Sequence, residues 1–173
     1  MPGLSPTIVE HHIDTWSNAH LVQQNQRQLH PSKVATIKQE IDKFHKVKFI
    51  YPFAYMYWVS KLVPVIKKQG TIRVYTDFRD LNKACPKNNY PTPFINQVID
   101  ACVNHGALSF MDGFFGYSQI QIRHTDQYKM AFTTPWGTFS YQVMSFSLKN
   151  VGATFQRAMN YIFHHLVHLI IAY

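Results

Sequence analysis

Apolar positions recur every three or four residues in three stretches of the chain, which predicts three amphipathic helices. The first runs from Ser32, its expected N-cap, to Lys48. The second is expected to be capped by Thr92, with Pro93 in its first turn. Gly106 should end it, and its apolar face should pack on a neighbouring sheet. The stripes consist of Val34, Ile37, Ile41 and Phe44, then Ile95, Val98, Ile99, Cys102 and Val103, then Phe155, Ala158, Met159, Ile162, Phe163 and Leu166.

Alternating apolar residues predict strands between these helices. Two β-hairpins are expected, each joined by a turn that contains glycine. The first pairs Leu62–Lys67 with Ile72–Thr76, and the second pairs Met130–Thr134 with Thr138–Val143. With a further strand inside Leu108–Ile122, the order of elements predicts an α+β domain without internal repeats.

Residues 1–30 differ from the rest of the chain because they are polar and show no sustained period. They are expected to form an extended lead-in that packs loosely, and residues 31–173 form the folded domain. His11, His12 and His20 lie in this lead-in, but no further Cys or His completes a tetrahedral zinc site. A structural or solvated role is therefore the expectation for these histidines.

Asp112 is the first candidate for chemistry, because it follows a short apolar run and precedes a glycine. A buried carboxylate is costly unless a cation or a hydrogen-bond donor meets it, so Asp112 is a candidate metal ligand. An Asp-Gly pair is also a common turn, in which the aspartate only caps the backbone. The local pattern leaves both interpretations open.

The 173-residue chain has a formal net charge of +8 and a pI near 9.5, which favours an acidic partner such as nucleic acid. Between Lys61 and Tyr90, seven basic residues face only Asp77 and Asp80. The basic residues are Lys61, Lys67, Lys68, Arg73, Arg79, Lys83 and Lys87. This segment is expected to bind phosphates through lysine charges and arginine forks, and a merely solvated hairpin is the alternative.

Cysteine usage and hydropathy limit the cellular setting. Cys85 and Cys102 fit neither a metal-binding spacing nor a disulfide framework, and the N-terminus lacks a signal-peptide pattern. These features predict a reducing, intracellular compartment. The apolar run at residues 166–172 is far shorter than the roughly 20 residues that cross a bilayer, so no membrane segment is expected.

Several blocks of sequence together carry a more specific signal than any one of them. They are Arg73–Lys87, Leu108–Ile122, Gly137–Phe139 and Leu148–Arg157. In this order and spacing, the blocks resemble the reverse transcriptase of gypsy-type long-terminal-repeat retrotransposons. The similarity covers about residues 31–173, and residues 1–30 resemble the connector between protease and polymerase in such polyproteins.

The resemblance implies a right-hand polymerase, with fingers from the basic hairpin and a palm of antiparallel strands backed by helices. Such an enzyme is an RNA-directed DNA polymerase, a nucleotidyltransferase that joins deoxynucleotides to a primer 3′-hydroxyl by a two-metal mechanism. It implies an RNA template, a DNA primer and deoxynucleoside triphosphates as partners, with Mg²⁺ or Mn²⁺ as cofactor. The expected location is the cytoplasm or a virus-like particle.

The resemblance also implies roles for individual residues. Asp112 corresponds to the first catalytic, metal-binding aspartate, and the Gly113 carbonyl would add an oxygen ligand. Tyr117 corresponds to the aromatic gate against a 2′-hydroxyl. The other nucleotide-binding residues implied are Lys67, Lys68, Arg73 and Phe146. The template- and primer-binding residues implied are Arg79, Asn82, Lys83 and Gln156.

The sequence departs from the family pattern in several places. The family has a Tyr-x-Asp-Asp turn that completes the metal site, and residues 169–173 resemble the strand that enters it. The two aspartates of that turn are not among residues 1–173, so Asp112 is the one metal-binding aspartate expected here. A single aspartate is a poor Mg²⁺ site, so the 173-residue chain alone is expected to lack polymerase activity. Ser145 and Ser147 stand where Pro and Gly are usual, and Ile72 stands where an aromatic residue is common.

Two interpretations of function follow from these observations. In the first, the chain is part of the RNA-directed DNA polymerase of a retrotransposon. In the second, it is a decayed transposon remnant that binds nucleic acid through its fingers and does no chemistry.

Overall fold

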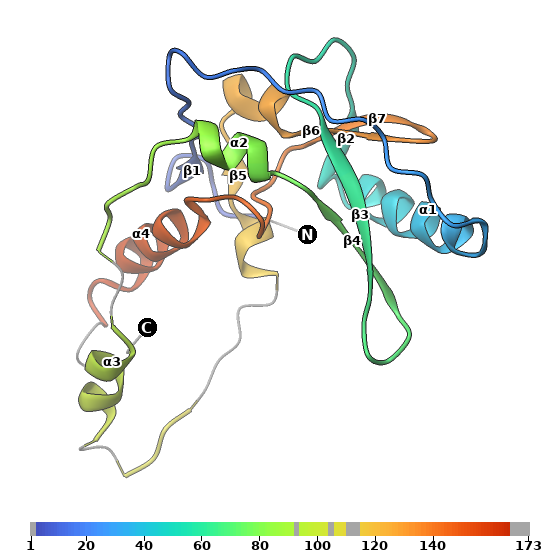
Figure 1. The fold of residues 1–173 in the computed structure, drawn as a ribbon. Helices are drawn as coiled ribbons and strands as arrows, with labels where there is room; N and C mark the ends of the chain where they lie inside the picture. The colour runs from blue at the N-terminus through green and yellow to red at the C-terminus, as the bar shows by residue number, and fades with distance from the viewer. Residues whose placement is uncertain (1–2, 92–93, 104–105, 110–114, 167–173) are drawn as a thin grey trace.

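Two hairpins form most of a five-stranded sheet in the computed structural model, which describes residues 3–91, 94–103, 106–109 and 115–166 (Figure 1). The strand order is β2-β7-β6-β3-β4. Its strands are β2 (Ile50–Pro52), β3 (Ser60–Ile66), β4 (Ile72–Thr76), β6 (Ala131–Thr134) and β7 (Gly137–Tyr141). β3 pairs with β4 and β6 with β7, both antiparallel, which confirms the two predicted hairpins. A short parallel pairing between β3 and β6 joins them.

The remaining elements lie outside this sheet. They are β1 (Glu10–His11), β5 (Gln121–Ile122), α1 (Pro31–Lys46), α2 (Arg79–Ala84), α3 (Ile95–Cys102), α4 (Val151–Phe163) and the 3-10 helices η1 (Gly116–Gln119) and η2 (His124–Met130). The β3–β4 hairpin extends away from the body of the sheet, and α4 and α1 lie on opposite sides of the molecule (Figure 1). No helix among the described residues has the length and apolar character to cross a membrane.

The predicted first and third helices are confirmed as α1 and α4. Ile37 and Ile41 are buried on α1, as their spacing predicts. The expected N-cap is wrong, because α1 begins at Pro31 and His30 caps it. The His30 side chain accepts a hydrogen bond from the Ser32 backbone N–H at 3.3 Å. Proline suits this first position because it has no N–H to leave unsatisfied there.

The second helix is present as α3, but its predicted burial is wrong. Ile95, Ile99 and Val103 are 74%, 55% and 70% exposed. Spacing identifies the apolar face of a helix, and it does not say which segment covers that face. The helix ends at Cys102, before Gly106, and the expected cap at residues 92–93 lies outside the described residues.

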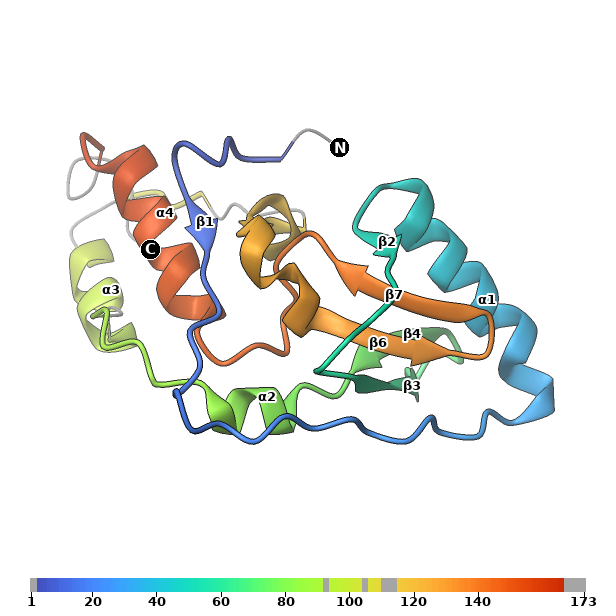
Figure 2. The ribbon, with the colours of Figure 1, turned by 90° about the horizontal axis from the view of Figure 1, so that it is seen from above.

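Residues 9–13 of the lead-in pack closely against the domain, so the expectation of loose packing is wrong for this part. β1 pairs in parallel with β5, and Val9, His11 and Ile13 are buried. From there the chain runs past α2 and β3 to α1 along one side of the molecule (Figure 2). The three buried residues occupy alternate positions, as in a strand. Because the middle one, His11, is polar, the sequence does not show an alternation of apolar and polar residues there.

A buried ion pair fixes the lead-in at Ile13. Lys129 lies 2.7 Å from the Asp126 carboxylate, and both side chains are almost fully buried. The Ile13 N–H donates to Asp126 Oδ2 at 3.1 Å, and Lys129 Nζ donates to the Ile13 carbonyl at 2.5 Å. Both backbone groups of Ile13 are therefore satisfied by charged side chains that pair with each other.

Gln24 makes a second attachment of the lead-in. Its side-chain oxygen accepts a hydrogen bond from the Lys61 N–H at 2.9 Å. Its amide nitrogen donates to Asp80 at 2.8 Å and to the Asp77 carbonyl at 3.3 Å. One side chain thus joins the lead-in to β3 and to the start of α2.

The stability of the fold is expected to fall in acid because of His11. Burial, with a smaller contribution from the charge of His12, lowers the pKa of His11 from 6.5 to about 4. Between these values the unfolded chain binds a proton that the folded chain does not, so acidification through this window favours unfolding. Full protonation should cost about 3 kcal/mol. Urea unfolding at pH 7.5 and 4.5 measures this loss.

A His11→Asn variant should lose about 2 kcal/mol less between these two pH values than the parent. Replacing the exposed His20 by Asn is the matched control and should follow the parent. Equal pH dependence in the parent and in His11→Asn would contradict the prediction.

Candidate nucleotide and nucleic-acid site

Tyr117 and Phe146, both predicted to contact the nucleotide, lie side by side. Their ring centroids are 5.6 Å apart, and Tyr117 also packs edge-on against Phe155 of α4 at 4.9 Å. Phe146 is 72% exposed, so most of its ring is available to a ligand. The structure therefore brings two of the predicted site residues into contact, and Phe155 packs against one of them, Tyr117.

Gly116 allows this close packing. A Cβ atom at Gly116 would lie 3.1 Å from the Phe155 ring, which is closer than an ordinary contact. The preceding residue, Phe115, has a left-handed backbone with φ of 49°, so the chain turns sharply into η1. The sequence motif of an aromatic residue, glycine and Tyr117 thus has a steric reason in this structure.

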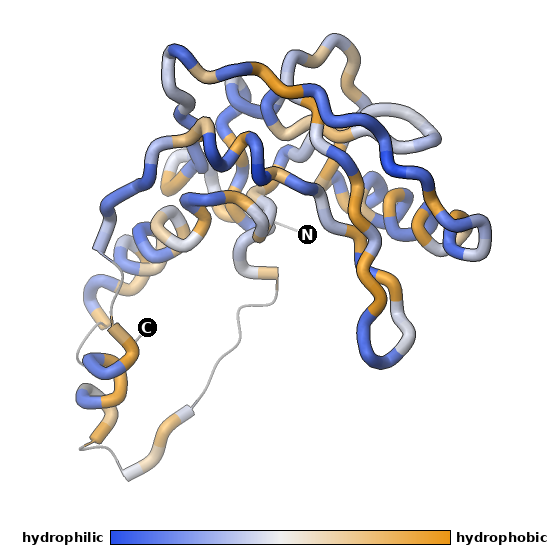
Figure 3. Tube along the Cα trace, in the orientation of Figure 1, coloured by the Kyte–Doolittle hydropathy of each residue, from blue (hydrophilic) through white to orange (hydrophobic). Residues whose placement is uncertain are grey.

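The predicted phosphate-binding residues Lys67, Lys68 and Arg73 lie on the β3–β4 hairpin. The turn is closed by a hydrogen bond from the Lys67 N–H to the Thr71 carbonyl at 2.9 Å, and Gly70 has a positive φ of 79°. Lys68 and Arg73 are exposed, and the described part of the chain provides no ion pair for any of the three cations. The end of the hairpin is hydrophilic (Figure 3). These charges are available to an anion.

Arg79 and Lys83 of α2, predicted to contact the template, are paired with acids. Arg79 holds both oxygens of Asp77, at 2.8 and 2.7 Å, and Lys83 lies 3.2 Å from Asp80. The hydrogen bond from Arg79 lowers the pKa of Asp77. The pKa of Asp80 is lowered first by its hydrogen bond from Gln24 and then by Lys83. Both cations remain exposed and can reach a phosphate, and in this structure each shares its charge with an acid.

Asn82, the third residue predicted at the template, uses its amide inside the protein. Its nitrogen donates to the Ser147 carbonyl, and its oxygen accepts from the Lys149 N–H, each at 2.8 Å. Gln156 lies on α4, where it donates to Asn160 at 3.2 Å. The predicted metal ligands Asp112 and Gly113 lie outside the described residues. Within the described ranges, no group of three His, Cys, Asp or Glu side chains could hold a metal ion.

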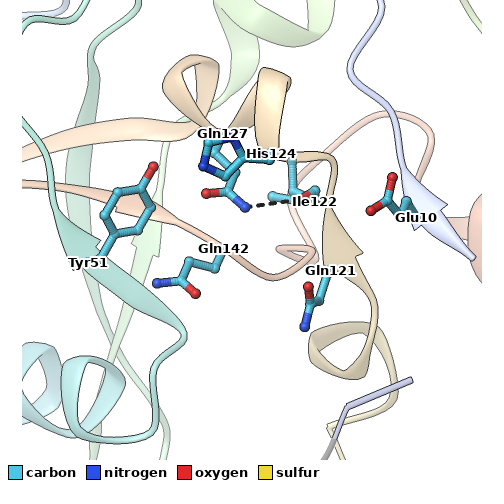
Figure 4. Close-up of a pocket in the computed structure, with 7 residues that line it drawn as sticks. All are labelled: Glu10, Tyr51, Gln121, Ile122, His124, Gln127 and Gln142. Atoms are coloured by element: carbon cyan, nitrogen blue, oxygen red, sulfur yellow. Dashed lines mark hydrogen bonds between the residues drawn. The ribbon is translucent and has the colours of Figure 1, made fainter. Parts of the chain in front are cut away.

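A cavity of about 340 Å³ lies elsewhere and contains none of the predicted site residues. Its lining is mostly polar, and residues of β1, β2, β5 and η2 surround it (Figure 4). The residues are Glu10, Tyr51, Gln121, Ile122, His124, Gln127 and Gln142. Burial raises the pKa of Tyr51, although the hydrogen bond with Ser140 opposes this.

Sequence reasoning missed the side chains that support the aromatic pair. Phe155 lies inside the quoted block Leu148–Arg157, and its helical spacing indicated a core residue. Its contact with Tyr117 depends on the long-range packing of α4 against η1. The hydrogen bonds of Asn82 left no periodic signal at all, because their partners are 65 and 67 residues away.

Comparison with known proteins supports the expected family. The family model described as reverse transcriptase (RNA-dependent DNA polymerase) matches residues 65–173, which is more than half of the chain. The Tf2-3 and Tf2-7 transposon polyproteins of Schizosaccharomyces pombe are 36% identical to it over 98 residues. This match covers 57% of the chain and 7% of each polyprotein, so the chain spans a small part of these relatives.

Solved structures give the same fold. The foamy viral protease-reverse transcriptase in complex with dsDNA matches 99% of this chain and 35% of its own, with a TM-score of 0.79 and 19% identity. The complex with an RNA/DNA hybrid matches 95% of this chain and 22% of its own, with a TM-score of 0.77 and 19% identity. These matches confirm the predicted fold of fingers and palm. The family match over more than half of its length establishes that the chain belongs to the reverse transcriptase family.

Proposed function

We propose that this chain provides the fingers and part of the palm of an RNA-directed DNA polymerase of a retrotransposon. The contact between Tyr117 and Phe146 carries the proposal, because it joins two segments that the resemblance assigns to the nucleotide. Lys67, Lys68 and Arg73 of the β3–β4 hairpin, which form no ion pair with another described residue, add a second element that suits a triphosphate. An RNA template, a DNA primer and deoxynucleoside triphosphates are the proposed partners.

Each group has a distinct task in this proposal. Lys67, Lys68 and Arg73 neutralise the triphosphate as it enters, and the Tyr117 ring lies against the sugar, where a 2′-hydroxyl would collide with it. Arg79 and Lys83 contact the template backbone, and Gln156 faces the template groove. The chemistry is mainly positioning and charge stabilisation, as in other phosphoryl transfers.

The proposed metal ligands fit magnesium by their chemistry. The Asp112 carboxylate and the Gly113 carbonyl are hard oxygen donors, which Mg²⁺ prefers. A bound pair of metal ions would stabilise the attacking and leaving oxygens of the transfer. We propose Asp112 and Gly113 as ligands from the resemblance alone, since both lie outside the described residues.

Primer extension tests the proposal. Residues 65–173 replace the matching segment of the Tf2-3 polyprotein, and the purified chimera is given an RNA template, a DNA primer and deoxynucleotides. Template-dependent extension is expected. A chimera that folds and binds the primed template but adds no nucleotide, while the unaltered polyprotein does, would overturn the proposal.

Neutralising the hairpin should weaken binding of the 173-residue chain to an RNA/DNA hybrid. With Lys67, Lys68 and Arg73 replaced by Gln, affinity at low salt should fall by at least about tenfold, because fewer counterions are released on binding. The slope of log affinity against log salt should fall by about one unit for each lost phosphate contact. Fluorescence anisotropy across a salt series measures both quantities.

A matched variant separates the hairpin from net charge. Replacing the exposed Arg27, Lys38 and Lys46 by Gln removes the same charge from the lead-in and α1. It should change affinity much less than the hairpin variant. If both triple variants lost affinity equally, the hairpin would have no specific role in binding.

A further inference from the structure

Phe146 lies in the turn between β7 and α4, and the bonds on either side of it show what holds it. Before Phe146, the Met144 N–H donates to the Ile120 carbonyl at 2.9 Å. Ile120 lies three residues after Tyr117 in the sequence. This bond places the start of the turn beside η1. Phe146 is 72% exposed, so packing among the described residues covers only a small part of it.

The other end of the turn is held by Asn82. The Asn82 side chain donates to the Ser147 carbonyl and accepts from the Lys149 N–H, both at 2.8 Å. One planar amide thus bonds the backbone on both sides of Leu148, as a neighbouring strand would do. Leu81 of α2 and Leu148 of the turn are both buried in the hydrophobic core.

Further hydrogen bonds join the same two segments. Ser147 Oγ donates to the Thr76 carbonyl at 3.2 Å. Lys149 Nζ donates to the Cys85 carbonyl at 2.7 Å, and Asn150 Nδ2 donates to the Pro86 carbonyl at 2.9 Å. Of these bonds, only those of Asn82 and Ser147 reach the residue next to Phe146, and only Asn82 supplies both a donor and an acceptor to the turn.

We propose that Asn82 is a positioning residue that holds Phe146 against Tyr117. The proposal rests on the proposed function, because it gives Phe146 its task at the nucleotide. Asn82 acts through the turn: its amide fixes residues 147–149, and the bond at Met144 fixes the other end. Asparagine meets this need because an aspartate cannot donate to the Ser147 carbonyl and a leucine of similar size can make neither bond.

Nuclear magnetic resonance of the full 173-residue chain tests the proposal. Cross-peaks between the Tyr117 and Phe146 rings report their contact, and hydrogen exchange of the Lys149 amide reports its bond to Asn82. In Asn82→Leu the cross-peaks should be lost, and Lys149 exchange should accelerate at least about tenfold, as expected for the loss of one such bond. A purely structural role would lower the melting temperature and leave the cross-peaks of the folded chain intact.

The Asn82→Asp variant provides the same test if Asn82→Leu does not fold. It keeps the acceptor for Lys149 and loses the donor to Ser147, so exchange of the Lys149 amide should stay slow while the ring cross-peaks weaken. Asn25→Leu is the matched control, because Asn25 is exposed in the lead-in. Cross-peaks of parental intensity in the folded Asn82 variants would overturn the proposal.

Binding to an RNA/DNA hybrid separates this proposal from direct template contact. A loss of affinity in Asn82→Leu with the ring cross-peaks intact would show that Asn82 contacts nucleic acid itself, and would overturn the positioning role. Failure of the parent chain to bind the hybrid would count against the proposed function. The cross-peaks would still decide the role of Asn82 in that case.

Discussion

Replacing Lys129 with alanine is expected to lower the free energy of unfolding by about 3–5 kcal/mol. The change leaves the Asp126 carboxylate almost fully buried without its cation, and it leaves the Ile13 carbonyl without the Lys129 donor. Removing one partner of a buried pair is costly because the remaining charge is not returned to water. Urea unfolding followed by circular dichroism at pH 7 measures the loss.

Two further variants make this test specific. Lys43 forms an exposed pair with Glu40, and Lys43→Ala should change stability by no more than about 0.5 kcal/mol. The double variant Asp126→Asn/Lys129→Met should be more stable than Lys129→Ala, since it leaves no unpaired charge buried. A Lys129→Ala chain within about 1 kcal/mol of the parent would show that the pair does not anchor the lead-in.

Asparagine in place of Asp112 is expected to reduce primer extension by the chimera at least about a hundredfold. Loss of a metal-binding carboxylate removes several kcal/mol of charge stabilisation from the transition state, and each 1.4 kcal/mol is about tenfold in rate. The measurement is the single-turnover rate with saturating RNA/DNA primer-template, over a range of Mg²⁺ and Mn²⁺ concentrations.

Asp100→Asn is the matched control, because Asp100 is an exposed acid on α3. Its extension rate should equal that of the parent chimera. If Asp112→Asn retained the parental rate at every metal concentration, Asp112 would not be a metal ligand, and the turn-capping interpretation would apply instead.

Local patterns predicted the elements whose partners are close in the chain. The β3–β4 hairpin follows from alternation and the turn at Gly70, since both strands and their connection lie within residues 60–76. The lead-in was misjudged because its burial depends on β5 and η2, more than 100 residues away. The apolar face of α3 was expected to be buried and is exposed. The spacing of apolar residues identifies such a face, and it does not show whether another segment covers it.

The candidate site was likewise predictable only in part. The resemblance assigned Tyr117 and Phe146 to the nucleotide, and the structure brings their rings together. Ser147 stands where the family usually has glycine, and in the structure its hydroxyl donates a hydrogen bond to the Thr76 carbonyl. The two hydrogen bonds of Asn82 to this turn could not be predicted, because polar contacts between distant segments leave no trace in residue spacing.

The attachment of the lead-in also determines an order of folding. Ile13 meets Asp126 across 113 residues, and His11 meets Thr154 across 143 residues. Closing such long loops costs chain entropy before any contact compensates for it, and it slows folding. During synthesis, β1 therefore stays unpaired until β5, η2 and α4 have emerged, so the lead-in is made before its partners and is among the last segments of this domain to reach its native place.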